Sequence, residues 1–368
     1  MIKIALIEPY FTGSHSQWAL SLKKFSRHCI KIFSMKGNYW KWRMHGGAIT
    51  LSKELNTSSF KPDIILATDM LDLATFLSLL NRKPRASAIY FHENQLTYPW
   101  SPKDRDIKEK RDFHYGFINI TSALVANAVY FNSEFHKTSF INAVSKFLKS
   151  FPDYNNTDSK DKILLKSQKL QLGLNLKKFD NFNVEKTNDI PVLLWNHRWE
   201  YDKNPKDFFD VINLLKKDNI QFKLVLLGER FGNYPEEFKN AINNLKDKIL
   251  HIGYAKSFEE YAGWLWKSDV IPITSNQEFF GVSCIEAIYC KCIPLLPNRL
   301  AFPEHFKNKK FNNYFYESKD QLYIKLKKIL CEFRTKKTPD FRKEIIKYDW
   351  QKTIKIYDNQ FSKLLDNV

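Results

Sequence analysis

Residues 190–228, "IPVLLWNHRWEYDKNPKDFFDVINLLKKDNIQFKLVLLG", decide the fold that the sequence predicts. The apolar run at 190–195 is typical of a buried strand, and residues 221–228 form a second one. Between them, residues 204–219 place apolar side chains at helical spacing. Two buried strands joined by a helix predict a parallel sheet with helices on both faces.

The same alternation continues along the chain. Downstream, we expect helices at 236–248, 257–269 and 283–290 and strands at 249–255, 270–275 and 292–298. Upstream, the pattern is less regular, with strands expected at 3–9, 29–33, 63–69, 86–93 and 128–134, and helices such as 16–28 and 71–81. The sequence therefore predicts an α/β protein with two Rossmann-like, doubly wound domains.

The length of 368 residues also favours two domains. The polar, turn-rich stretch 181–189 marks the expected boundary, which gives domains 1–185 and 186–345. Residues 346–368 carry apolar side chains at helical spacing, and we expect this helix to pack back on the first domain. Two such domains facing a central cleft would present strand ends and helix N-termini, where ligands and phosphates bind.

The composition limits the partners and the compartment. There are 58 Lys and Arg against 40 Asp and Glu, a net charge of +18 that attracts nucleic acid, acidic membrane or phosphorylated small molecules. Solvated helix faces rich in lysine are the alternative explanation. We expect no signal peptide, and no apolar stretch approaches the roughly 18 residues of a membrane span. The five cysteines lack a C-x-x-C pair and predict free thiols in a cytoplasmic protein.

The stretch "QEFFGVSCIEAIYC", residues 277–290, places Glu278 and Glu286 after a predicted strand. Two such carboxylates can be an acid/base pair, metal ligands, acceptors for sugar hydroxyls, or a surface charge and a helix cap. Ser283 and Glu286 fit the S-x-x-E capping box, so Glu286 has a structural explanation as well. Glu278 has none, and it lies near Gly281, which allows the backbone to approach a ligand.

This pattern, in which four residues separate E-F-F-G from E-A, resembles the E-x7-E signature of retaining glycosyltransferases of family 4, which have the GT-B fold. The resemblance implies that Glu278 contacts hydroxyls of the donor sugar and that Glu286 contacts the nucleotide ribose. It also implies that the neighbours of the first glutamate lie near the donor's sugar and phosphates: Phe280, Gly281 and Val282.

Two cations follow the first strand of the second domain. Arg198 and Lys203 could hold a diphosphate and stabilise the charge of the leaving group, or they could be exposed loop charges. The resemblance implies the first role. It also implies that Gly253 and Tyr254, in a loop similar to the family's base-binding loop, lie near the nucleobase. No D-x-D motif marks an evident metal site, so we expect no metal cofactor.

In the first domain, Gly13 and Ser14 link a predicted strand to a helix, where backbone amides can approach phosphates, although any tight turn uses glycine. His92 ends a predicted strand and can be a satisfied loop residue. In the family, a histidine in this slot contacts the donor sugar. The three residues that follow are candidates for the acceptor or sugar side: Glu93, Asn94 and Gln95.

Longer strings are similar to the tRNA-queuosine α-mannosyltransferase family over nearly the whole chain, among them "IEPYFTGSHSQWA", "YFHENQLTYP", "HRWEYDKNP" and "EFFGVSCIEAIYCKCIPLLP". This resemblance implies transfer of mannose from GDP-mannose to the cyclopentene diol of queuosine in the tRNA anticodon loop. Retention would come from front-face attack, with the leaving phosphate taking the acceptor proton. The reacting groups would then be contacted by His92, Arg198, Lys203 and Glu278.

A second feature fits an RNA partner. Residues 36–43, "KGNYWKWR", interleave cations that can hold phosphates with aromatic rings that can stack on unpaired bases: Lys36, Tyr39, Trp40, Lys41, Trp42 and Arg43. A packed edge with solvated lysines is the alternative. Further acceptor-side candidates follow in a basic stretch: Arg111, His114 and Tyr115.

The sequence departs from the wider superfamily at two positions, since Lys291 and Thr12 stand where glycine is expected. Two other functions stay open. One is a retaining glycosyltransferase with a lipid or cell-envelope acceptor, and the other is an RNA-binding protein without catalytic activity. A glycosidase fits poorly, because its two carboxylates must flank a single bond.

Overall fold

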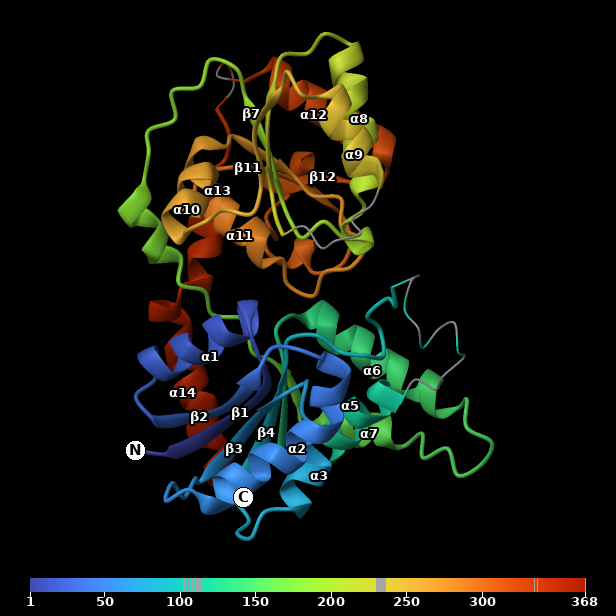
Figure 1. The fold of residues 1–368 in the computed structure, drawn as a ribbon, viewed down its shortest axis with the longest axis vertical. Helices are drawn as coiled ribbons and strands as arrows, with labels where there is room; N and C mark the ends of the chain where they lie inside the picture. The colour runs from blue at the N-terminus through green and yellow to red at the C-terminus, as the bar shows by residue number, and fades with distance from the viewer. Residues whose placement is uncertain are drawn as a thin grey trace. The chain divides into compact units, whose positions relative to one another are not determined.

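The computed structural model describes residues 1–101, 104, 106, 109, 114–229, 236–333, 335 and 337–367. The chain forms two compact units, one of Met1–Asn175 with Tyr348–Val368 and one of Leu176–Lys347. Each unit is built on a six-stranded parallel sheet with helices packed on it (Figure 1). The predicted class of two doubly wound α/β sheets is confirmed.

The sheet of the first unit has the strand order β2-β1-β3-β4-β5-β6. Its strands are β1 (Lys3–Phe11), β2 (Cys29–Lys36), β3 (Ile64–Thr68), β4 (Ala86–Phe91), β5 (Ala128–Phe131) and β6 (Ser167–Lys169). The central strands are buried along their whole length because helices cover both faces, which explains their continuous apolar runs. The order reverses between β1 and β3, and the carboxyl ends of these two strands flank the position where ligands bind in such sheets.

Helices pack on the first sheet in two groups. Helix α1 contacts α14, whereas α2, α3 and α5 contact one another, and α6 contacts α7 (Figure 1). The bounds are α1 (Gly13–Phe25), α2 (Trp40–Thr57), α3 (Leu73–Ser78), α5 (His114–Val125), α6 (Glu134–Leu148), α7 (Ser159–Leu165) and α14 (Trp350–Asp366).

The C-terminal helix α14 packs on the first unit, as predicted. Trp350 is buried against Gly173, where any side chain would lie within 2.6 Å of the indole ring. The Tyr357 hydroxyl accepts a hydrogen bond from Trp18 Nε1 at 3.2 Å and donates one to the Gln171 carbonyl at 3.1 Å. The last helix of the chain thereby supports the part of α1 that lies beneath the carboxyl end of the sheet.

The sheet of the second unit has the order β12-β11-β10-β7-β8-β9, with the reversal between β7 and β10. Its strands are β7 (Val192–Asn196), β8 (Lys223–Leu227), β9 (Ile249–Gly253), β10 (Val270–Pro272), β11 (Ile293–Pro297) and β12 (Phe315–Tyr316). Helices α8, α9 and α12 pack together, as do α10, α11 and α13. Their bounds are α8 (Pro205–Lys217), α9 (Glu236–Asn244), α10 (Phe258–Lys267), α11 (Val282–Tyr289), α12 (Lys319–Cys331) and α13 (Phe341–Ile345).

The division between the units lies before residue 176, earlier than the boundary at 185 suggested by the polar stretch. Residues 176–182 form a 3-10 helix that belongs to the second unit. Phe179 is buried there, its ring packs against that of Phe258, and its carbonyl accepts a hydrogen bond from Trp266 Nε1 at 2.9 Å. The polar composition of residues 181–189 marks a loop. Phe179, just before this loop, is buried in the second unit, so residues 176–182 belong to that unit.

None of the helices in the described part of the chain has both the length and the apolar character that a membrane-spanning helix needs. All five cysteines are free thiols, as expected, and Cys290 and Cys292 are buried beside β11.

Candidate active site

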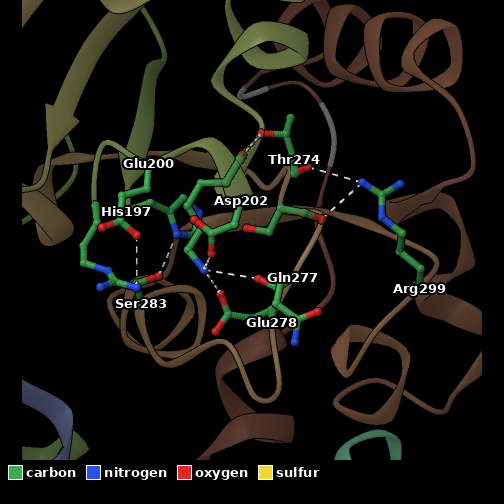
Figure 2. Close-up of polar contacts among 11 residues, drawn as sticks. His197, Glu200, Asp202, Thr274, Gln277, Glu278, Ser283 and Arg299 are labelled. Carbon is green, nitrogen blue, oxygen red and sulfur yellow. Dashed lines mark hydrogen bonds and ion pairs between the residues drawn. The ribbon is translucent and has the colours of Figure 1, made fainter. Parts of the chain in front are cut away.

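Several charged residues of the second unit lie in the loops at the carboxyl ends of β7 and β10, the two strands that flank its reversal. The loop after β7 carries His197, Arg198 and Lys203, and the loop after β10 carries Gln277 and Glu278. Figure 2 shows His197, Gln277 and Glu278 in this group. Parallel strands bring their carboxyl ends to one edge, so residues far apart in sequence meet there.

Lys203 is the centre of this group. Its side chain is 10% exposed, and its Nζ lies 3.0 Å from Glu278 Oε2, 3.0 Å from Asp202 Oδ2 and 3.2 Å from the Gln277 carbonyl. Burial lowers the pKa of Lys203, but Glu278 and Asp202 outweigh it, and the pKa lies above its usual value. The lysine is therefore an ammonium ion held by two carboxylates.

This contact corrects the expectation that Glu278 lacks a structural partner. One carboxylate oxygen of Glu278 accepts the hydrogen bond from Lys203. The two residues are 75 positions apart, and only the meeting of the two loops brings them together. The side chain of Glu278 remains 19% exposed, so it can still reach a ligand.

Arg198 differs from Lys203, since its side chain is 49% exposed and its guanidinium lies 3.3 Å from Glu200 Oε2. The residue before it, His197, was missed by the sequence analysis although it adjoins a predicted cation. His197 is buried, and its Nδ1 lies 3.4 Å from Ser283 Oγ. Burial and then the charge of Lys203 lower the pKa of His197 to about 3, so the imidazole is neutral.

Glu286 has a partner on the neighbouring helix. Its Oε2 accepts a hydrogen bond from the Tyr261 hydroxyl at 2.6 Å, and that hydroxyl accepts one from Asn196 Nδ2 at 2.9 Å. Burial raises the pKa of Glu286 to about 7, while the bond from Tyr261 opposes the rise. Tyr261 and Asn196 were not predicted; the packing of α10 against α11 brings Tyr261 to Glu286, and Asn196 reaches Tyr261 from the end of β7.

The expected capping box of Ser283 and Glu286 is wrong. Helix α11 begins at Val282 after Gly281, which takes the N-cap position with a φ of +92° and offers no side chain to cap the helix. Ser283 lies inside the first turn, and its hydroxyl faces His197. Because no side chain caps this helix, the amides of its first turn are available to an anion.

The other predicted donor residues of the second unit fall into two groups. Phe280 is buried and packs on His305, and Val282 is half-buried in the first turn of α11. Gly253 ends β9 with a φ of +115°, and the adjacent Tyr254 is 72% exposed. An exposed aromatic ring at a strand's carboxyl end is suited to stack on a planar ligand.

In the first unit, a compact cluster forms at the carboxyl ends of β1, β3 and β4. Glu8 is fully buried, and its two oxygens accept hydrogen bonds from the Tyr10 amide at 2.9 Å and from His15 Nδ1 at 3.0 Å. Asp69 follows β3 and accepts the His92 amide proton at 2.7 Å. Neither Glu8 nor His15 was selected by the sequence analysis, although a glutamate inside the apolar run "KIALIEP" is a signal, because a buried carboxylate needs a partner.

His92 is enclosed by rings. The centroids of His15, Trp18 and Tyr90 lie 4.3, 4.7 and 4.8 Å from that of His92. Burial, and next the charge of His15, hold the pKa of His92 well below its usual value, so it is a neutral imidazole. Its Nε2 is buried and has no hydrogen-bond partner among the described residues, which leaves it able to bind a ligand atom.

Glu8, His15 and His92 also bring one potential ligand atom each within 4.8 Å of one another, the one such group in the described part of the chain. Both oxygens of Glu8 are occupied by Tyr10 and His15. We therefore interpret the cluster as a buried ion pair beside a neutral histidine.

The residues after His92 are used mainly within their own turn. Asn94 is buried and its Oδ1 accepts from the amides of Leu96 and Thr97 at 3.0 and 2.9 Å. Glu93 and Gln95 are half-buried and hydrogen-bonded to each other at 3.1 Å.

The basic and aromatic stretch 36–43 precedes and begins α2. Lys36 is exposed, Tyr39 and Trp42 are 79% and 61% exposed, and Arg43 donates to the Lys36 carbonyl at 3.1 Å. Trp40 instead packs on Tyr115, and Lys41 is held by Asp104 and Asp106 at 2.6 and 2.5 Å.

The other acceptor-side candidates lie further along the chain. His114, at the start of α5, has its Nε2 3.0 Å from His45 Nε2, whereas Arg111 lies outside the described residues.

The two departures from the superfamily pattern have structural consequences. Lys291 follows α11 in a left-handed conformation with a φ of +64°, where glycine has no steric cost. Thr12 is extended, with a φ of −156°, and takes the N-cap position of α1 without capping it.

Comparisons with known proteins cover both units. A family model described as "tRNA-queuosine alpha-mannosyltransferase N-terminal" matches residues 3–174, and one described as "Glycosyl transferases group 1" matches residues 177–348. A tRNA-queuosine alpha-mannosyltransferase of Drosophila melanogaster is 34% identical over 324 residues, which cover 84% of this chain and 83% of that protein.

Among solved structures, a sucrose-phosphate synthase from Thermosynechococcus elongatus is similar over 100% of both chains, with a TM-score of 0.72 and 13% identity. The Anabaena protein HepE in complex with UDP-glucose is also similar over 100% of both chains, with a TM-score of 0.68 and 14% identity. At these identities the structures show the fold alone, and that fold is the expected GT-B fold.

Proposed function

This chain belongs to the tRNA-queuosine alpha-mannosyltransferase family, and on that premise we propose that it transfers mannose from GDP-mannose to the cyclopentene diol of queuosine in tRNA. It is a glycosyltransferase, as its match to the group 1 model and its relative indicate. The observation that carries the proposal is the ion pair of Lys203 and Glu278 at the strand reversal of the second unit, next to a helix whose N-terminus no side chain caps.

The site residues then have distinct tasks. Glu278, steadied by Lys203, accepts hydrogen bonds from hydroxyls of the sugar, and Glu286, steadied by Tyr261, accepts those of the ribose. Lys203, Arg198 and the first-turn amides of α11 stabilise the diphosphate as negative charge develops on it. In the first unit, His92 offers its unpartnered Nε2 to a sugar hydroxyl, and the amides of Gly13 and Ser14 face phosphate.

The bond from the anomeric carbon to the phosphate oxygen breaks, and a bond from that carbon to the acceptor hydroxyl oxygen forms on the same face. The acceptor proton passes to the departing phosphate oxygen, so no side chain acts as general base. Since lysine, arginine and helix amides supply the positive charge, we expect transfer to continue in the presence of EDTA.

For the acceptor, the exposed rings of Tyr39 and Trp42 beside Lys36 suit unpaired bases and phosphates of an RNA loop. We assign Trp40 and Lys41 a smaller part in RNA binding than the sequence predicts, because each already has partners within the first unit. Action on tRNA also fits a cytoplasmic enzyme.

The test is transfer of radiolabelled mannose from GDP-mannose to tRNA that carries queuosine and to the same tRNA without it. We expect label only on the first. Equal labelling of both, or label on lipid extracts instead, would exclude the acceptor. Glu278→Ala should abolish transfer, with Glu317→Ala on the surface of the same unit as its control.

A further inference from the structure

His15 belongs to the first-unit cluster and has no task in the proposed function. It is the third residue of α1 and is only 8% exposed. Its Nδ1 is engaged by Glu8 at 3.0 Å, whereas its Nε2 has no hydrogen-bond partner among the described residues. That nitrogen is also absent from the fully buried unpartnered atoms of the described chain, so it reaches the surface of the cluster.

The groups that face His15 determine its charge. They are Glu8 from β1, Asp69 after β3, and His92 and Glu93 after β4, with the Tyr10 ring at 6.1 Å. Burial lowers the pKa of His15, but Glu8 and then the other two carboxyl groups raise it to about 9. His15 is therefore protonated at neutral pH, and its Nε2 must carry a proton that nothing in the described protein accepts.

The first turn of α1, to which His15 belongs, is also open. Thr12 takes the N-cap position without a side-chain hydrogen bond to the helix, so the first amides of α1 lack that partner. Gly13 has a φ of +49°, and a side chain built on it would meet nothing within 4 Å. An anion is the ligand that suits this place. It is favoured by the free amides, by the positive end of the helix dipole and by the charged N–H of His15.

We propose that His15, oriented by Glu8, binds a phosphate group together with the N-terminus of α1. This inference rests on the proposed function, in which that phosphate belongs to the sugar nucleotide. His15 adds a charge-assisted donor that backbone amides alone do not provide. The neighbouring His92 stays neutral beside it and is left for hydroxyl groups of the ligand.

The experiment measures binding of inorganic pyrophosphate and of GDP to the full chain by calorimetry. His15→Gln keeps a polar side chain of similar length but removes the charge. We expect the Kd of both ligands to rise about tenfold at pH 7.5, as for loss of one charge-assisted hydrogen bond. The control is Lys24→Gln, which removes an exposed cation at the other end of α1 and should change Kd less than twofold.

The pH dependence separates this role from a structural one. In the wild type, affinity should fall as the pH rises through about 9, where His15 loses its proton. Glu8→Gln keeps the histidine but removes the group that raises its pKa most, so the fall should move to lower pH. Asp69, whose pKa burial raises to about 8, also ionises in this range; the charge of His15 lowers that pKa and Glu8 raises it, so the two substitutions move the Asp69 contribution in opposite directions.

Three results would overturn the proposal: no binding of pyrophosphate to the wild type, equal affinity in His15→Gln, or an unmoved pH midpoint in Glu8→Gln. If His15→Gln unfolds, as its thermal transition would show, the Glu8→Gln profile decides alone. Failure of mannose transfer to tRNA with these binding results intact would count against the proposed function and not against this site.

Discussion

The two sheets place their polar residues at equivalent positions but use different chemistry. In the second unit, the reversal between β7 and β10 is occupied by a permanent charge, Lys203, neutralised by two carboxylates. In the first unit, the reversal between β1 and β3 is occupied by groups that titrate at weakly alkaline pH, with a pKa of about 9 for His15 and about 8 for Asp69. The difference indicates that the second unit supplies charge at any physiological pH, and that the first unit can respond to pH.

The largest effect should follow from removing the permanent charge. Lys203→Gln leaves Glu278 and Asp202 without their shared cation, and a buried pair that loses one partner costs about 3 kcal/mol or more in unfolding free energy. The same change removes charge stabilisation from the leaving group, so kcat should fall by about 10²–10³. Initial rates with GDP-mannose and thermal unfolding measure the two effects.

Lys206→Gln is the matched control, because Lys206 lies on the exposed face of α8 and pairs there with Asp210, one turn along the helix. It should leave both measurements within experimental scatter. A Lys203→Gln enzyme with normal kcat would show that the second unit does not depend on this charge, and the comparison between the units would fail.

Much of this arrangement follows from the sequence, because buried parallel strands show as continuous apolar runs and polar residues at their ends mark the ligand edge. Lys203, Glu278 and His92 were selected in this way. Their contacts were not, since the bond from Lys203 to Glu278 joins residues 75 positions apart. The capping box failed for a related reason: a local spacing of S-x-x-E does not reveal that Gly281 already occupies the cap.

The next prediction compares the two helix starts. Gly13 and Gly281 both have left-handed φ values, +49° and +92°, but their surroundings differ. A side chain on Gly281 would lie 3.0 Å from the Phe302 ring, whereas one on Gly13 would enter open space. Gly281→Ala should lower the unfolding free energy by about 2 kcal/mol, and Gly13→Ala by about 1 kcal/mol.

Denaturant unfolding measures these values, and pyrophosphate binding adds the informative contrast. Because the new methyl group of Gly13→Ala would occupy the space next to the open amides of α1, this variant should lose affinity out of proportion to its small loss of stability. Equal stability losses in the two variants would show that Phe302 yields to the added methyl group, and unchanged binding in Gly13→Ala would show that no anion occupies that space.

The smallest effect concerns Glu286, a group of the second unit that titrates near neutral pH. Burial raises the pKa of Glu286 to about 7, and the hydrogen bond from Tyr261 lowers it, so Tyr261→Phe should raise that pKa further. Only the carboxylate form accepts two ribose hydroxyls, so KM for GDP-mannose should rise as the pH falls, beginning at higher pH in the variant. A further rise of one unit in the Glu286 pKa corresponds to about a tenfold higher KM at pH 6.5, with kcat little changed.

Tyr323→Phe, which removes another tyrosine–carboxylate hydrogen bond in this unit, is the control. If the KM profiles of Tyr261→Phe and wild type coincide, Glu286 does not bind the donor as a carboxylate, and pH dependence belongs to the first unit alone.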